Sequence, residues 1–162
     1  MIFMLFYSHM SRRYSLVDNI LLSTGADRYC PIIVLFRDDC ILMGHRHYQF
    51  SQGQGPQSVW TMPGGRCRPR ETVESALRRE VYEETGIARF SISDLVAIVP
   101  GAHNQDVVII FHGRTHEDFK LMEPKNFSEW KWFTRQNYIA GTMGVFNSQA
   151  RSAILALISK HQ

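Results

Sequence analysis

One helix-forming segment, residues 65–87, constrains this chain more than any other part of its sequence. Thr72 is a good N-cap, Glu74 favours the first helical turn, and Gly86 supplies a stop after the last turn. The pattern between them predicts one helix of roughly four turns. Its inward stripe changes from apolar to acidic along the axis, through Val73, Ala76, Leu77, Glu80, Glu83 and Glu84.

The three glutamates lie in the last turn and a half of this helix, where the helix dipole favours cations rather than carboxylates. A run of charges on a helix is usually a solvated face, but these three continue the core-facing stripe. Like charges roughly 6 Å apart repel by about 3 kcal/mol per pair at an effective dielectric near 20. A divalent cation would remove that cost, so the segment predicts a metal site and, with it, phosphate chemistry.

Hard oxygen ligands favour Mg²⁺, with Mn²⁺ as the alternative. Tetrahedral zinc is disfavoured because no His/Cys quartet has suitable spacing. The three cysteines form no close-spaced pair, and an odd count argues against a disulfide framework. A reducing, cytoplasmic setting is therefore expected.

Length and charge limit the remaining options. The 162 residues, 44% of them hydrophobic, predict a single domain over residues 1–162 with one substantial core. A net charge of +3 suits a small polyanionic ligand, but the chain lacks the Lys/Arg runs of a nucleic-acid-binding protein. The apolar opening, Met1 to Tyr7, is too short to span a bilayer, so we expect a terminal strand or tail and no membrane association.

Short β-branched runs predict strands on either side of the acidic helix. Ile32–Phe36 and Cys40–Met43 indicate a hairpin, with Arg46 just beyond its second strand, and a polar surface loop from Tyr48 to Ser58 follows. Further strands are expected around Val59–Met62, Leu95–Val99, Val107–His112 and Trp130–Phe133, and a last helix over Ser148–Lys160.

The acidic helix and its approach match the Nudix box, G-x5-E-x7-R-E-U-x-E-E-x-G-U with U apolar, at every position. The matching residues are Gly65, Glu71, Arg79, Glu80, Val81, Glu83, Glu84, Gly86 and Ile87. The chain thus resembles a Nudix hydrolase over about residues 28–162. The resemblance implies an α/β fold, an α/β/α sandwich around a central mixed β-sheet. The first 27 residues form an N-terminal extension with no placed counterpart.

Roles for individual residues follow from the resemblance. Glu80, Glu83 and Glu84 would hold the metal, together with the carbonyl of Gly64. Arg79 would orient a motif glutamate through a charge-assisted hydrogen bond, and Glu71 would support the junction between loop and helix.

Four residues outside the box are further candidates. Glu129, taken as a loop carboxylate before the strand that begins at Trp130, resembles an additional acidic ligand or base; either it or Glu83 would accept the proton from water. Arg46 resembles an arginine that grips substrate phosphate. His103 and Asn104 could reach the site from a polar loop, where a histidine could act as a base. For each of these, a solvated surface side chain is the alternative.

The expected activity is hydrolysis of a nucleoside diphosphate derivative. A nucleoside or deoxynucleoside triphosphate, giving monophosphate plus pyrophosphate, is the first choice of substrate. Nucleotide sugars such as GDP-mannose, and ADP-ribose, are the alternatives, because base and sugar preference lie in loops. A nucleotide-sensing domain without hydrolysis is a further alternative, although it would not need an intact glutamate set. A homodimer is possible.

Overall fold

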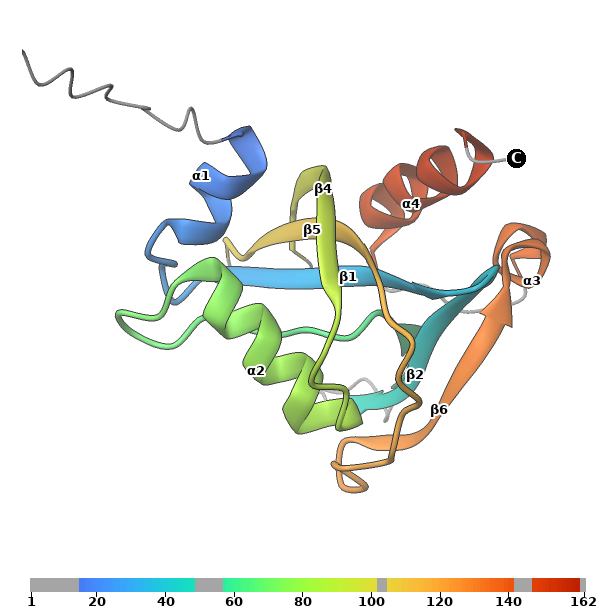
Figure 1. Cartoon of the computed structure of the whole chain (residues 1–162). Helices are drawn as coiled ribbons and strands as arrows, with labels where there is room; N and C mark the ends of the chain where they lie inside the picture. Colours follow the sequence, from blue (N-terminus) through green and yellow to red (C-terminus); the bar gives the residue numbers. More distant parts are fainter. Residues whose placement is uncertain (1–14, 49–56, 102–104, 142–146, 161–162) are drawn as a thin grey trace, which may run out of the picture.

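The computed structural model describes residues 15–48, 57–101, 105–141 and 147–160. A mixed β-sheet forms its centre, with α1 (Leu16–Leu22) and α2 (Val73–Thr85) on one face and α4 (Ser148–Lys160) on the other (Figure 1). A short helix, α3 (Arg135–Ala140), joins the sheet to the α4 side. The predicted α/β/α sandwich is therefore confirmed.

The sheet has six strands: β1 (Tyr29–Arg37), β2 (Cys40–Tyr48), β3 (Gln57–Thr61), β4 (Ser91–Pro100), β5 (Val107–Arg114) and β6 (Phe127–Thr134). Five of them run in the order β3-β2-β1-β5-β4, and β6 pairs with the other edge of β2. β1 and β5 are parallel, whereas the remaining pairs are antiparallel. The sheet is mixed, as the sequence predicts.

Strand alternation divides the interior into two cores, as a period of two requires. Along β1, Ile33 and Leu35 pack toward α2, while Val34 and Phe36 pack toward α4. All four side chains are buried. Both faces of β1 are covered, which explains why its sequence is a continuous apolar run. The Pro31 carbonyl of β1 also accepts a hydrogen bond from the Gly65 N–H, which fixes the turn before α2 against this strand.

Two predicted strand boundaries were wrong. Arg46 does not lie beyond the second strand but within β2, which pairs with β3 on one edge and β6 on the other as far as this residue. Glu129 is not a loop residue, because β6 begins at Phe127 and Glu129 pairs with His45. Pairing with a neighbouring strand places polar residues in a strand even where the local sequence shows no apolar strand pattern.

Other elements differ more modestly from the predictions. Of the predicted loop from Tyr48 to Ser58, Tyr48 lies in β2 and Gln57 and Ser58 pair in β3, while residues 49–56 lie outside the described residues. α1 occupies part of the predicted N-terminal extension, begins at a capping box formed by Ser15 and Asp18, and buries Leu21. The stretch from Met1 to Tyr7 lies outside the described residues.

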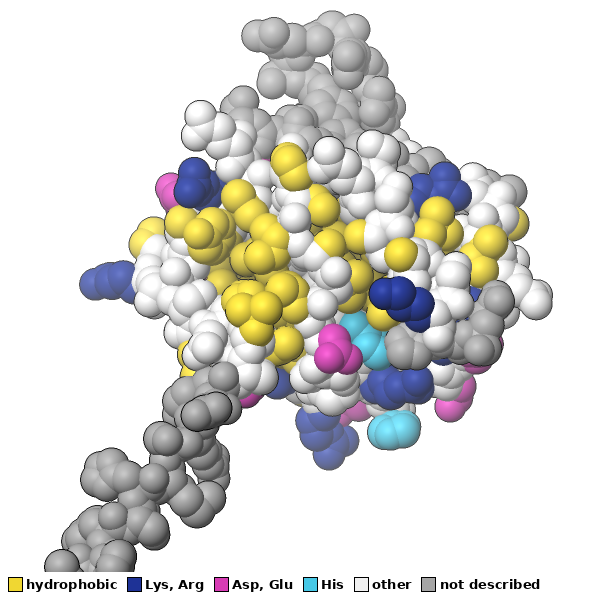
Figure 2. Space-filling model, turned by 90° about the horizontal axis from the view of Figure 1, so that it is seen from above, with side chains coloured by type: hydrophobic (Ala, Val, Ile, Leu, Met, Phe, Trp, Pro, Cys, Tyr) yellow, Lys and Arg dark blue, Asp and Glu magenta, His cyan; other side chains and the backbone are white. Residues whose placement is uncertain are grey.

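Hydrophobic side chains gather over α1 and β4 on the face seen from above (Figure 2). Leu16, Leu22 and Ile98 are among the exposed large apolar residues. β4 is the terminal strand of the sheet path, and register shifts interrupt its pairing with β5 at two places. Such irregularities reduce the tendency of an edge strand to pair with another chain. No helix in the described ranges is long and apolar enough to span a membrane.

Candidate active site

α2 positions the three glutamates as the sequence predicts. Thr72 caps its start by accepting a hydrogen bond from the Ser75 N–H, and Gly86 ends it in the left-handed conformation at φ 72°. Val73, Ala76 and Leu77 are buried in the core beneath the helix. At the C-terminal end the Glu80 and Glu83 side chains are 20% and 37% exposed, whereas the whole Glu84 residue is only 2% exposed.

Glu84 is the most unusual of the three, since a carboxylate loses most of its hydration when it is buried. Its Oε2 accepts a 3.0 Å hydrogen bond from the Gly64 N–H, and its Oε1 lies 3.6 Å from an Arg46 guanidinium nitrogen. Burial nevertheless raises the pKa of Glu84 to about 8, outweighing the lowering effects of Gly64 and Arg46. A further cation beside this carboxyl would favour its ionised form.

Two consecutive glycines bring the Pro-Gly-Gly turn against both β1 and α2. Gly64 has φ 134°, and a Cβ there would overlap the backbone carbonyl of Pro31. Gly65 donates its N–H to the same carbonyl at 3.1 Å, and a Cβ on Gly65 would stand 2.5 Å from the Glu80 carboxyl. The turn can approach the helix closely only because both positions lack side chains.

Arg79 forms ion pairs with three glutamates of the Nudix box. Its guanidinium makes two hydrogen bonds to Glu71, of 2.8 and 3.0 Å, in bidentate geometry. It also donates to Glu80 at 2.6 Å and to Glu83 at 2.9 Å, and to the Arg66 carbonyl at 3.0 Å. The side chain is only 16% exposed. Arg79 therefore ties the loop, through Arg66 and Glu71, to the acidic end of α2.

Glu71 completes this link from the loop side. Its Oε2 accepts the Arg68 backbone N–H at 2.8 Å in addition to the bonds from Arg79. The Arg79 hydrogen bonds lower the pKa of Glu71 and outweigh burial, which raises it, and the bond from the Arg68 N–H lowers it further. An ionised Glu71 thus fixes both the loop backbone and the orientation of Arg79.

The donor set suits a hard divalent cation, because it combines three carboxylates with a glycine turn. Burial of the Glu84 carboxyl supports this fit independently of the motif. In the part of the chain that the structure describes, however, no three carboxylate, imidazole or thiol groups converge on one point. Glu80 and Glu83 instead face Arg79. A cation at Glu84 would therefore share these two carboxylates with Arg79, which binds Oε1 of Glu80 and Oε2 of Glu83.

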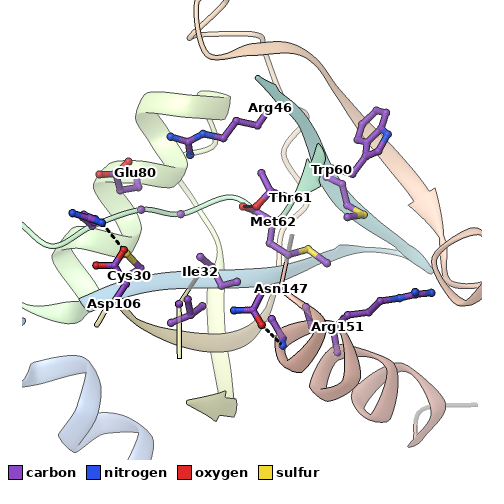
Figure 3. A pocket seen from close by; sticks show the side chains of 18 of the residues that line it. Cys30, Ile32, Arg46, Trp60, Thr61, Met62, Glu80, Asp106, Asn147 and Arg151 are labelled. Carbon is purple, nitrogen blue, oxygen red and sulfur yellow. Dashed lines mark hydrogen bonds and ion pairs between the residues drawn. The ribbon is translucent and has the colours of Figure 1, made fainter. Parts of the chain in front are cut away.

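A pocket of about 500 Å³ opens beside the turn, between the sheet and α4 (Figure 3). Gly64, Gly65, Glu80 and Arg46 form the end nearest the box. Apolar and aromatic side chains form most of the remaining wall: Ile32, Met43, Trp60, Met62, Val108, Tyr138, Ala150 and Ile154. Such a lining can enclose a flat heterocycle while the acidic end faces its phosphates.

A polar cluster closes one side of the pocket. Arg66 forms an ion pair with Asp106, whose side chain is 11% exposed, and Cys30 lies beside both. Burial, followed by the charge of Asp106, raises the pKa of the Cys30 thiol. On the α4 side, Asn147 donates to the Pro100 carbonyl at 2.8 Å and accepts the Ala150 N–H at 3.0 Å. Donors and acceptors thus line a mainly apolar cavity.

The structure brings together most, but not all, of the predicted site residues. Two bonded groups meet at the C-terminal half of α2: one joins Glu84 to Gly64 and Arg46, and the other joins Arg79 to Glu71, Glu80 and Glu83. Glu129 is exposed and does not line the pocket; it lies opposite His45, whose ring packs on Trp60 rather than facing α2. His103 and Asn104 lie outside the described residues.

Sequence reasoning missed several residues of the pocket. Arg66 and Asp106 are 40 residues apart, and only the parallel pairing of β1 with β5 brings the start of β5 beside the Gly-Gly turn. Tyr138 comes from a helix of six residues, too short for a periodic signal. Asn147 and Arg151, at the start of α4, line the pocket only because this helix packs against the sheet, which the sequence does not reveal.

A carboxylate-bearing helix held against a glycine turn, within an α/β/α sandwich, defines the class of this protein. The NUDIX domain model matches residues 28–151. The chain belongs to the Nudix hydrolase family.

Known relatives and structures agree with that assignment. The chain is 30% identical over 120 residues to an NAD-capped RNA hydrolase, NudC, of Salmonella typhi, covering 70% of this chain and 44% of the relative. It is 29% identical over 96 residues to an RNA pyrophosphohydrolase of Erythrobacter litoralis, covering 46% of this chain and 58% of the relative. It thus spans about half the length of these curated relatives.

Two solved structures illustrate the shared fold. A MutT protein from Methanosarcina mazei has a TM-score of 0.62 at 20% identity, over 82% of this chain and 93% of the other. A C. elegans Ap4A hydrolase has a TM-score of 0.63 at 18% identity, over 82% and 97%. At these identities the similarity shows the fold alone.

Proposed function

We propose that this chain is a Mg²⁺-dependent hydrolase that cleaves the pyrophosphate linkage of a nucleoside polyphosphate. The observation that carries the proposal is the buried Glu84 carboxyl, held by the Gly64 N–H at 3.0 Å beside two further glutamates of α2. A purely structural role would be served better by an apolar side chain, because burying a carboxylate is costly. The simplest substrate is a nucleoside or deoxynucleoside triphosphate, which would give monophosphate plus pyrophosphate.

Glu80, Glu83, Glu84 and the Gly64 carbonyl would hold the metal, for which Mn²⁺ is an alternative to Mg²⁺. When bound, the ion would supply Lewis acidity toward phosphate oxygens and neutralise their charge. Glu84 would serve as the anchoring ligand, since it already lies against the turn. Arg79 would keep Glu80 and Glu83 oriented toward that position.

The remaining groups would bind the substrate and receive its proton. Arg46, which lines the pocket next to Glu84, would grip a phosphate through charge-assisted hydrogen bonds. The apolar pocket would enclose the nucleoside. Glu83, the most exposed of the three helix carboxylates, would accept the proton from the attacking water at a side-chain oxygen. Cleavage would then give two phosphate products from one P–O–P linkage and one water.

A second candidate substrate is the 5′ end of an RNA. The similarity to an NAD-capped RNA hydrolase and an RNA pyrophosphohydrolase supports it. The net charge of +3 is modest for this role, because phosphate contacts provide most of the affinity for nucleic acid. GDP-mannose and ADP-ribose remain small-molecule alternatives.

The experiment that tests the proposal is product analysis with Mg²⁺ or with EDTA. The panel comprises nucleoside and deoxynucleoside triphosphates, ADP-ribose, GDP-mannose, NAD and a short RNA with a 5′-triphosphate. We expect Mg²⁺-dependent cleavage of a P–O–P bond in at least one substrate class. Binding of nucleotides without cleavage of any of them would favour a nucleotide-sensing domain instead.

A further inference from the structure

A short segment that follows α1, Ser23–Gly25, lies against the loop that leads into α2, and we call this segment the strap. α1 itself lies beside α2 (Figure 1). The Gly25 N–H donates a 2.9 Å hydrogen bond to the Glu71 carbonyl, and the Val73 N–H donates to the Ser23 carbonyl at 3.0 Å. The residues between these two bonds form an isolated antiparallel bridge. The strap therefore pairs with the loop at the point where α2 begins.

Packing fixes the strap from its other side. Leu21, in the last turn of α1, is buried in the core beneath α2. Gly25 is also buried, and a Cβ there would overlap the Cys67 sulfur. Cys67 is in turn joined to β1, because its N–H donates to the Tyr29 carbonyl at 2.9 Å. The strap is thus attached to both the core and the central strand.

The loop has little packing of its own. Arg68, Pro69 and Arg70 are exposed. Arg70 has φ 66°, a left-handed conformation that a non-glycine residue keeps only where its surroundings hold the backbone. The strap provides such a hold at the next residue, through its bond to the Glu71 carbonyl. It therefore fixes the backbone of Glu71 where packing of the loop does not.

Glu71 transmits this position to the acidic end of α2. Its carboxylate accepts two hydrogen bonds from Arg79, of 2.8 and 3.0 Å. The same guanidinium donates to Glu80 at 2.6 Å and to Glu83 at 2.9 Å. A shift of Glu71 would therefore move the Arg79 guanidinium and change the orientation of both glutamates.

We propose that the strap is a positioning element of the metal site, acting through Glu71 and Arg79 on Glu80 and Glu83. This inference rests on the proposed function, which assigns metal-binding roles to these two glutamates. The strap precedes residue 28, where the match to the family domain begins. A segment before the matched domain thus takes part in holding the metal ligands of that domain.

The test measures the dissociation constant of Mn²⁺ alone, by electron paramagnetic resonance of the free ion, in wild type and Gly25→Ala. The added Cβ should push the strap away from the loop. Loss of a group that orients metal ligands weakens metal binding by about 10- to 100-fold. We expect about tenfold, the lower end, because the strap acts through two intervening residues. Cys67→Ala removes the overlapping sulfur, so the double variant should regain part of the affinity.

Val73→Pro is a second variant that adds no steric overlap at the strap. Proline suits the first position of a helix, and Thr72 before it is already extended at ψ 157°. The substitution removes the N–H that binds Ser23 and should also weaken Mn²⁺ binding. Ile158→Ala is the control, because Ile158 is buried in α4 on the opposite face of the sheet. It should lower the melting temperature and leave Mn²⁺ binding unchanged.

The two hypotheses fail in different ways. A lower melting temperature in Gly25→Ala and Val73→Pro with the wild-type Mn²⁺ dissociation constant would overturn the positioning role, even if hydrolysis is robust. An equal loss of Mn²⁺ affinity in Ile158→Ala would overturn it as well. Mn²⁺ binding that depends on the strap, without cleavage of any substrate, would support the positioning role and reject the hydrolase. No Mn²⁺ binding by the wild type would reject the metal site itself.

Discussion

The backbone N–H of Gly64 donates a 3.0 Å hydrogen bond to the buried carboxyl of Glu84, which joins the glycine turn to the last turn of α2. The two residues are 20 positions apart, and the bond forms only because Gly64 fits against the carbonyl of Pro31 in β1. The central strand β1, the glycine turn and α2 thus meet at one point. The proposed chemistry depends on that point remaining intact.

Alanine substitutions at the two neighbouring glycines should separate folding from activity. In Gly64→Ala, a Cβ at φ 134° would overlap backbone, so we expect a loss of stability of about 1–3 kcal/mol or more. In Gly65→Ala the clash is with the movable end of Glu80, so the melting temperature should change little while kcat falls. Thermal unfolding and steady-state kinetics measure both. A larger loss of stability in Gly65→Ala than in Gly64→Ala would contradict the geometry of these two positions.

Arg79→Ala should be strongly destabilising. The substitution removes the partner of Glu71 and Glu80, whose side chains are 14% and 20% exposed, and breaking such a pair costs about 3–5 kcal/mol when the remaining charge is fully buried. Partial exposure places the expected loss at the lower end. Denaturant unfolding measures it, with Arg78→Ala on the same helix as the control, because Arg78 pairs with the more exposed Glu74. Equal effects of the two substitutions would argue against Arg79 as the centre of the network.

Glu117 provides a test of pH dependence away from the site. Hydrogen bonds from the Arg89 side chain and from the Arg89 and Ala88 N–H groups lower its pKa from 4.5 to about 2. A lowered folded-state pKa contributes stability above the unfolded value and loses it as pH falls through the folded value. Glu117→Gln should therefore lower the melting temperature at pH 7, and the difference from wild type should shrink between pH 4.5 and 2. A difference independent of pH would contradict this assignment.

Local sequence signals account for the elements that were predicted correctly. The caps at Thr72 and Gly86, and the apolar-to-acidic stripe between them, are encoded within one helix, so α2 and its glutamates follow from the residues alone. Apolar runs likewise marked β1 and β5, which are central and buried. The capping box of Ser15 and Asp18 was an equally local signal for α1, which the prediction did not use.

Long-range strand pairing accounts for the features that could not be predicted from the sequence. The polar stretch from His45 to His47 is strand because β3 and β6 flank it, and neither neighbour can be inferred from the stretch itself. The same pairing places Glu129 opposite His45 rather than beside Glu84. The Arg66–Asp106 contact depends on the register of β1 and β5. Strand topology thus brings the pocket residues together, whereas the residues of the Nudix box all lie within one segment of the sequence.

The most direct test of the central claim is the rate of phosphoanhydride hydrolysis, with Mg²⁺ and with EDTA, in wild type, Glu84→Gln and Glu74→Gln. Both substitutions remove one carboxylate from α2, but Glu74 lies in its first turn, paired with Arg78 and away from the glycine turn. We expect Glu84→Gln to lower kcat by about 100-fold or more, as the loss of an electrostatic catalytic group does, and Glu74→Gln to match the wild type. Full Mg²⁺-dependent activity in a folded Glu84→Gln protein would contradict the account.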